Sequence, residues 1–207
     1  MSFGAQEIKA ARLHLQKSDP VMKQIIKSTG PFTAKIRRNR FLTLVNSILG
    51  QQISCKAADS IRKRLVEAVA PDDLVPETIL QFNIEQFREL GISRQKATYL
   101  HDLANQVVTG NVVLRTIGRK DDSKIIDDLT QIKGIGVWTA QMFLIFSLGR
   151  LDVFPDGDLG IKNAILKNYS VRGELTKVKM NKIAKPWRPY ATVASWYLWR
   201  SLENVPV

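Results

Sequence analysis

The chain has 207 residues, of which 31 are lysine or arginine and 19 are aspartate or glutamate, so its formal net charge is +12. This length is enough for one full hydrophobic core or for two small subdomains. The single cysteine, Cys55, excludes an internal disulfide and any zinc or iron–sulfur site built from cysteines. The basic excess favours a polyanionic partner, most commonly nucleic acid, over the alternative of a merely basic protein.

The positive charge is concentrated in two stretches of the chain. If both stretches flank one cleft, binding to a polyanion should weaken steeply with salt. The two stretches contain Lys35, Arg37, Arg38, Arg40, Lys56, Arg62, Lys63 and Arg64, and Lys162, Lys167, Arg172, Lys177, Lys179, Lys182, Lys185 and Arg188.

No stretch has the pattern of a signal peptide, a transit peptide or a membrane span, because polar residues interrupt every apolar run before about 18 positions. We therefore expect a protein without a membrane partner, located in the nucleus of a eukaryotic cell or otherwise in the cytoplasm. We also expect a monomer.

The predicted elements are helices almost throughout. Asp19-Pro20 opens the second helix, and Thr29-Gly30-Pro31 ends it. The short run Asn111–Leu114 is predicted to be an extended linker, so the expected fold class is all-α. In the first half, the helices are expected over Ala5–Lys17, Val21–Ser28, Phe41–Gly50, Lys56–Val69 and Ser93–Val108, with short helices in Pro76–Leu90.

A polar loop, Gln51-Gln52-Ile53-Ser54, joins two of these helices, and Ser54 is placed to cap the second one. Polar side chains in such a loop can fill the hole that an extruded base leaves in a duplex. The alternative is an ordinary solvated loop.

A glycine hairpin, Ile132–Gly136, separates a short helix from an apolar helix that Gly149 ends. The unpaired N–H groups and the partial positive charge at the start of the second helix attract phosphate, and glycines permit close approach. Thr139 could add a hydroxyl. The alternative is a helix-turn-helix corner packed into a core.

Asp158 comes directly before another predicted helix and is placed to act as its N-cap. A structural cap is the alternative to a functional carboxylate, which could stabilise a sugar cation. In the C-terminal helix, which runs to Leu202, Trp196 is the residue we pair with Trp138. Two indoles that face Asp158 would stack a flipped, cationic base, although aromatic residues on helices commonly belong to a core.

Four motifs, in this order, resemble the helix-hairpin-helix DNA glycosylases, and are most similar to the alkylbase (3-methyladenine) branch. The resemblance covers about residues 32–200, and its motifs are ILGQQISCKAA, IKGIGVWTA, PDGDLGIK and WRPYATVASWYLWR. It implies two helical subdomains that flank a DNA-binding cleft. Residues 32–150 would form the central subdomain that ends in the hairpin, and residues 1–31 and 151–207 would form the other.

The resemblance implies a base-excision-repair protein that binds double-stranded DNA carrying alkylated bases or abasic sites. It would flip out an alkylated purine and hydrolyse the N-glycosidic bond with the help of Asp158, without a cofactor. Such a base is already cationic, so one carboxylate could suffice. Gln52 would be the plug that enters the duplex. The other expected DNA contacts are Gln51, Ser54, Lys56, Gly134, Gly136 and Thr139. A monovalent cation, if bound as in relatives, would use the carbonyls of Thr130, Ile132 and Ile135.

Two departures from related sequences bear on activity. Bifunctional relatives carry a catalytic lysine where this chain has Trp138, which predicts a monofunctional enzyme that does not cleave the strand. Relatives often have an acidic residue directly before the catalytic aspartate, where this chain has Gly157, and glycine loosens that segment. Two alternatives therefore stay open: a protein that binds abasic or damaged DNA with little or no excision, and a general DNA-binding module.

Overall fold

A computed structural model describes residues 3–203 of the chain. Over these residues the structure has α-helices and two short 3-10 helices and no β-strand, which confirms the predicted all-α class. No helix in this range is both long enough and apolar enough to cross a bilayer.

Most helices lie where local sequence signals predict them. Among the α-helices the exception is α11, which was not predicted because it is rich in lysine and buries only Met180 and Ala184. The helices are α1 (Ala5–Ser18), α2 (Pro20–Thr29), α3 (Arg40–Leu49), α4 (Cys55–Val69), α5 (Pro76–Gln81), α6 (Ile84–Glu89), α7 (Arg94–Val108), η1 (Ile117–Arg119), α8 (Asp122–Thr130), α9 (Val137–Phe146), α10 (Leu159–Asn168), α11 (Lys177–Ala184), η2 (Lys185–Trp187) and α12 (Ala191–Glu203).

The chain divides into two compact units. Unit 1 contains the residues up to Ile36 and those from Leu144 onward, and unit 2 contains Arg37–Phe143. The expected boundaries were 31/32 and 150/151, so the second boundary falls inside α9 rather than after it. The last turn of α9 belongs to unit 1, where the ring of Phe146 lies 6.1 Å from that of Trp199.

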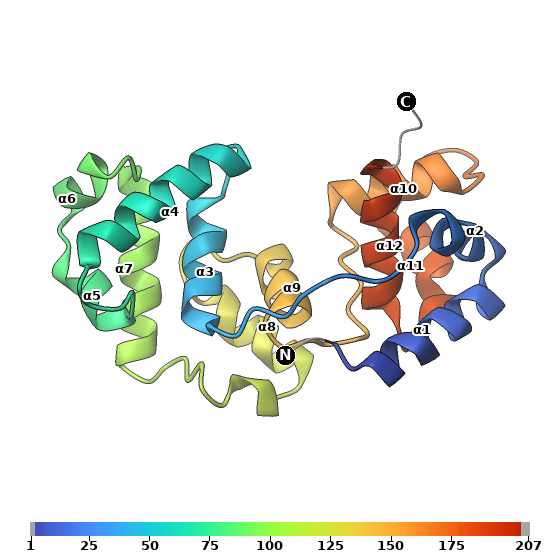
Figure 1. Cartoon of the computed structure of the whole chain (residues 1–207), viewed down its shortest axis with the longest axis horizontal. Coiled ribbons are helices and arrows are strands. Elements are labelled where there is room, and N and C mark those ends of the chain that lie inside the picture. The colour runs from blue at the N-terminus through green and yellow to red at the C-terminus, as the bar shows by residue number, and fades with distance from the viewer. Residues whose placement is uncertain (1–2, 204–207) are drawn as a thin grey trace. The chain divides into compact units, whose positions relative to one another are not determined.

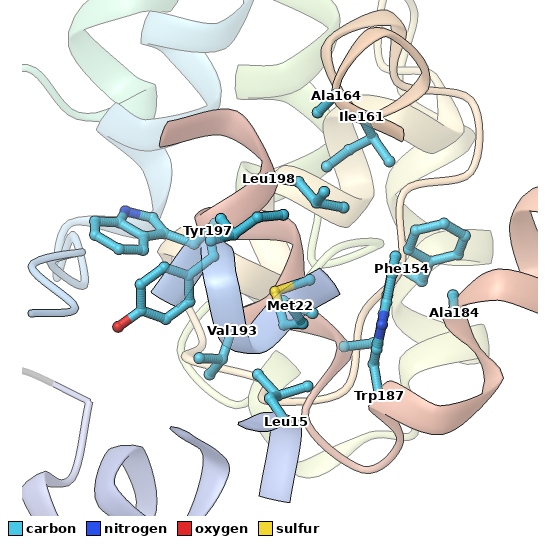
Figure 2. Packing of buried hydrophobic residues seen from close by; sticks show 14 of the residues in the cluster. Leu15, Met22, Phe154, Ile161, Ala164, Ala184, Trp187, Val193, Tyr197 and Leu198 are labelled. Atoms are coloured by element: carbon cyan, nitrogen blue, oxygen red, sulfur yellow. The ribbon is translucent and has the colours of Figure 1, made fainter. Parts of the chain in front are cut away.

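Unit 1 is built around α12, which α1, α2 and α10 contact although they come from opposite ends of the chain (Figure 1). Its core is a continuous cluster of apolar side chains from all these helices. Figure 2 shows Met22 among the side chains of α12 and Trp187 beside Phe154, with ring centroids 5.6 Å apart. Burial of this apolar surface is the main contribution to the stability of unit 1.

A buried carboxylate, that of Asp19, caps α2 inside this core. Its Oδ1 accepts hydrogen bonds from the backbone N–H groups of Val21 and Met22, and its Oδ2 accepts from the Tyr169 hydroxyl and the Trp187 indole at 2.7 Å each. Burial, together with the hydrogen bond to Asp19, raises the pKa of Tyr169. Four donors thus satisfy a charge that would be costly to bury alone.

Unit 2 packs α3 against α4 and α7, while α5 and α6 cover another part of α7 (Figure 1). Its interior includes Leu44, Ile48, Phe87 and Leu100, all fully buried. The apolar stripe of α3 faces this interior, so the loop that follows α3 starts from a fixed position. That loop and the α8–α9 hairpin carry the predicted DNA contacts of unit 2.

Candidate functional site

The hairpin between α8 and α9 depends on Gly134 for packing as well as for its turn. Gly134 has φ +81°, a conformation that strongly favours glycine. A Cβ at this position would lie 2.1 Å from the ring of Tyr99 on α7. The N–H of Lys133 also donates to Asp102 of α7 at 2.8 Å. Gly134 therefore lets the hairpin close onto α7.

Gly136 has a different role. A Cβ there would meet no atom within 4 Å, and the residue is exposed. Its carbonyl accepts the N–H of Ala140 and so begins α9. Val137 and Trp138, which follow it, are 54% and 48% exposed although both are apolar. The first turn of α9 thus presents an open, partly apolar surface at a helix N-terminus, which suits an anionic group.

Thr139 was expected to add a hydroxyl to this surface, but its exposed fraction is only 6%. Three consecutive residues of α9 therefore differ in exposure. Val137 and Trp138 are open to solvent, whereas Thr139 is buried. The burial does not favour a contact between Thr139 and phosphate.

The loop between α3 and α4, which we call the plug loop (residues 50–54), has an unusual backbone. Gln52 is exposed and has φ +57°, and it is the one non-glycine residue with positive φ between residues 3 and 203. Such a conformation costs free energy for a residue with a side chain and persists only where its surroundings enforce it. Strain of this kind in an exposed loop is often associated with binding.

Several hydrogen bonds hold the plug loop. The side chain of Ser54 accepts the N–H of Ala57, which confirms Ser54 as the N-cap of α4. The Nζ of Lys96 donates to the carbonyl of Leu49 at 2.7 Å, and burial lowers the pKa of Lys96. Lys56, in the first turn of α4, is exposed.

Gln51, which we expected to contact DNA, is used inside the protein. Its Nε2 donates to the carbonyl of Gly134 at 2.7 Å. The plug loop is therefore tied directly to the hairpin within unit 2. This bond gives Gln51 an internal role that its sequence position does not reveal.

In unit 1, Asp158 is the N-cap of α10, as predicted. It is 9% exposed, and its Oδ1 accepts the N–H of Ile161 at 2.7 Å. The same oxygen accepts a hydrogen bond from Nε1 of Trp199 at 2.9 Å. The backbone of α10 and the indole of Trp199 thus hold the same carboxylate oxygen.

The predicted base-pocket residue Trp196 lies three residues before Trp199 on α12. It is 9% exposed, and its ring packs 4.7 Å from that of Phe32 and 4.9 Å from that of Tyr197. The assignment of Trp138 and Trp196 to a base pocket stays a prediction. Sequence reasoning missed Trp199 and Phe32, and the spacing of aromatic residues on α12 was the only available signal for Trp199.

Gly157 sits in the turn that leads to Asp158. Its φ lies outside the left-handed region, and a Cβ there would have only the Nζ of Lys177 nearby, at 3.8 Å. Lys177 also lies 3.8 Å from a carboxylate oxygen of Asp156. The turn could therefore accept a side chain at position 157 without a clash, and an acidic one would face a lysine.

The chemistry of the hairpin carbonyls fits a monovalent cation. Thr130 is the last residue of α8, where helix carbonyls carry partial negative charge. The Ile132 carbonyl accepts the N–H of Ile135 at 3.0 Å, which leaves its second lone pair for a hard cation. Between residues 3 and 203, no group of three or more His, Cys, Asp and Glu side chains is arranged to hold a metal ion.

Comparisons with known proteins agree with this set of features. Residues 45–189 match the HhH-GPD superfamily of base excision DNA repair proteins. DNA-3-methyladenine glycosylase 1 of Schizosaccharomyces pombe is 32% identical over 196 residues, which cover 92% of this chain and 86% of that protein. The putative DNA-3-methyladenine glycosylase YfjP of Bacillus subtilis is 35% identical over 77% of this chain, and the chain spans 58% of the length of that relative.

A solved structure is also similar. It is the 3-methyladenine DNA glycosylase Mag1 of Schizosaccharomyces pombe in complex with abasic DNA. The TM-score is 0.81 at 31% identity, and the match covers 94% of this chain and 97% of the other.

Proposed function

The chain belongs to the HhH-GPD superfamily of base excision DNA repair proteins, and from this we propose that it removes alkylated purines from double-stranded DNA. The observation that carries the proposal is the carboxylate of Asp158, buried at a helix N-terminus and hydrogen-bonded by two donors. The relatives named as 3-methyladenine glycosylases and the solved complex with abasic DNA support this assignment.

In the proposed reaction the bond between C1′ of the sugar and the alkylated base breaks, and its electron pair leaves with the base. The base already carries a positive charge, so it departs as a neutral molecule without a general acid. The sugar becomes a cation that the negative charge of Asp158 stabilises. Water then attacks C1′, and Asp158 accepts the proton that this water loses.

Unit 2 would supply the contacts that hold the strand. The open surface at Gly136 and the N–H groups at the start of α9 suit a phosphate. Gln52, exposed on the strained plug loop, would fill the space that the flipped nucleotide leaves. Trp138 is exposed and could stack on a base. Because Trp138 stands where bifunctional relatives have lysine, we propose that the strand is not cleaved.

The remaining expectations are part of the same proposal. We propose that the protein acts as a monomer, in the nucleus of a eukaryote or otherwise in the cytoplasm. We also propose that it needs no cofactor, and that a monovalent cation at the hairpin carbonyls supports the turn.

Gly157 favours one alternative, a protein that binds abasic or damaged DNA with little excision. Glycine gives the segment before Asp158 more freedom than an acidic residue would, and a small displacement of a catalytic group can lower the rate strongly. In this case the DNA contacts of unit 2 would be kept while base release is slow.

Three duplexes separate these functions when the protein is in excess: one methylated, one with an abasic analogue and one undamaged. Release of methylated purine that is abolished in Asp158→Asn supports the enzyme. Tight binding to the abasic duplex without release supports the alternative. Equal affinity for all three duplexes would contradict both and leave only general DNA binding.

A further inference from the structure

The indole of Trp199 and the backbone of α10 hold the same oxygen of Asp158. Nε1 of Trp199 lies 2.9 Å from Oδ1, and the N–H of Ile161 lies 2.7 Å from it. The second donor belongs to the helix that Asp158 caps, whereas the first comes from α12. The carboxylate is therefore fixed relative to two helices, which restricts its rotation more than a cap alone would.

Gly160 makes this approach possible. A Cβ at position 160 would lie 3.0 Å from Oδ1 of Asp158 and 3.1 Å from Cδ1 of Trp199. The φ of Gly160 is not in the left-handed region, so its backbone does not need a glycine. Glycine is less favourable than alanine in a helix. Space for the indole beside the carboxylate explains why α10 has a glycine here.

The indole of Trp199 also packs near an aromatic ring of α9. The ring of Phe146 lies 6.1 Å from that of Trp199 with an interplanar angle of 30°. Trp199 itself is partly buried. Packing and hydrogen bonding thus both restrict the indole, so its N–H is held in place before any ligand binds.

The same fold contains a second pair of this kind that serves as a reference. The indole of Trp187 donates to Asp19, the N-cap of α2, at 2.7 Å. That pair lies in the core, where Trp187 is fully buried and both oxygens of Asp19 are hydrogen-bonded. This pair stabilises unit 1 and has no part in the proposed site at Asp158.

We propose that Trp199 is a positioning residue, which acts through Asp158 and directs the negative charge of this carboxylate at the sugar cation. Gly160 contributes by leaving room for the indole. This inference rests on the proposed function, because it assigns Trp199 to the same reaction. Trp199 does not need to touch DNA.

The test compares two duplexes that contain abasic analogues. One analogue is a pyrrolidine, which carries a positive charge and resembles the sugar cation, and the other is a neutral tetrahydrofuran. The ratio of their dissociation constants measures how well the Asp158 charge is aimed, separately from general DNA binding. Trp199→Phe keeps an aromatic ring but removes the N–H. We expect it to lower the preference for the cationic duplex by about tenfold, as for one charge-assisted hydrogen bond, and to leave tetrahydrofuran binding unchanged.

Two further variants make the test specific. Trp187→Phe removes the matching indole–carboxylate hydrogen bond at Asp19, and it should lower the melting temperature without changing the ratio. Gly160→Ala crowds the indole and should reduce the ratio in the same way as Trp199→Phe. If Trp199→Phe does not fold, the ratio measured for Gly160→Ala tests the positioning role instead.

The outcomes separate the positioning role from the proposed function. A wild-type preference for the cationic duplex that falls in Trp199→Phe and Gly160→Ala but not in Trp187→Phe supports the inference. A preference that survives in Trp199→Phe, or that falls equally in Trp187→Phe, overturns the positioning role alone. A wild-type protein with no preference overturns the proposed role of Asp158, and the role of Trp199 with it.

Discussion

The side chain of Gln51 donates a hydrogen bond to the backbone carbonyl of Gly134, with an Nε2···O distance of 2.7 Å. Gln51 belongs to the plug loop and Gly134 to the hairpin, and 83 residues separate them in sequence. Because Gly134 is also packed on Tyr99, the bond connects the plug loop to a rigid part of unit 2. Gln52, the next residue, is therefore held in its strained conformation by the hairpin.

Gln51→Glu should weaken DNA binding and lower stability. The substitution keeps the shape of the side chain but places a carboxylate against a carbonyl, so the donor is lost and repulsion replaces it. We expect a loss of about 1–3 kcal/mol in the free energy of unfolding and several-fold weaker binding to all duplexes. Chemical denaturation and fluorescence anisotropy measure the two effects. Gln24→Glu, on the exposed face of α2 in unit 1, is the control for the added charge. Unchanged stability in Gln51→Glu would show that the hydrogen bond from Gln51 to Gly134 does not couple the plug loop to the hairpin.

Gly134→Ala should mainly lower stability, whereas Gly136→Ala should mainly lower DNA affinity. At position 134 the methyl group meets the Tyr99 ring and the backbone has positive φ, so we expect a loss of at least about 2 kcal/mol in stability. At position 136 the space is open, so stability should change by less than about 1 kcal/mol while DNA affinity falls. The contrast is measured by thermal melting and by titration with an abasic duplex. A Gly136→Ala protein that binds as well as wild type would exclude this surface as a phosphate contact.

Gln52→Ala should reduce the preference for damaged over undamaged duplex, because the side chain that fills the vacated space is lost. Gln52→Gly removes the same side chain and also relieves the strain at φ +57°. We therefore expect Gln52→Gly to be more stable than Gln52→Ala. Both variants should show the same reduced preference for damaged duplex. Competition binding with matched duplexes gives the selectivity. Wild-type selectivity in both variants would contradict the plug assignment.

Gly157→Asp should accelerate base release if the flexibility of this turn limits the rate. The site has room for the side chain, and Lys177 lies nearby to pair with it. Reduced freedom of the unfolded chain should also stabilise the protein, by about 0.4–1 kcal/mol. Gly157→Ala is the matched control, since it stiffens the turn without adding charge. Single-turnover rates that stay at the wild-type level in both variants would show that Gly157 does not limit excision.

Local sequence signals were sufficient for most of the fold. Asp19-Pro20, Ser54 and Asp158 each mark the start of a helix. The structure confirms Ser54 and Asp158 as N-caps, and it shows Asp19 in the same role before Pro20. A capping residue acts within a few positions of itself, so the sequence contains the whole cause. The helix α11 was missed because its few buried residues give a weak apolar pattern.

The site depends on tertiary contacts that local signals do not contain. Trp199 and Asp158 are 41 residues apart, and only the packing of α10 on α12 brings them together. Trp196 and Trp199 differ by three positions, so they lie on the same side of one helix, and the pattern alone does not decide which indole reaches the carboxylate. Likewise, the sequence assigns the same role to both hairpin glycines, whereas the structure shows that Gly134 is packed against Tyr99 and that Gly136 faces open space.

The most direct test of the account is single-turnover release of methylated purine by the wild-type protein and by Asp158→Asn. The amide is close in size to the carboxylate and can still accept hydrogen bonds from Ile161 and Trp199, while the negative charge is lost. We predict that base release falls by at least about a hundredfold while affinity for the tetrahydrofuran duplex is kept. Release at the wild-type rate by a folded Asp158→Asn protein would contradict the account.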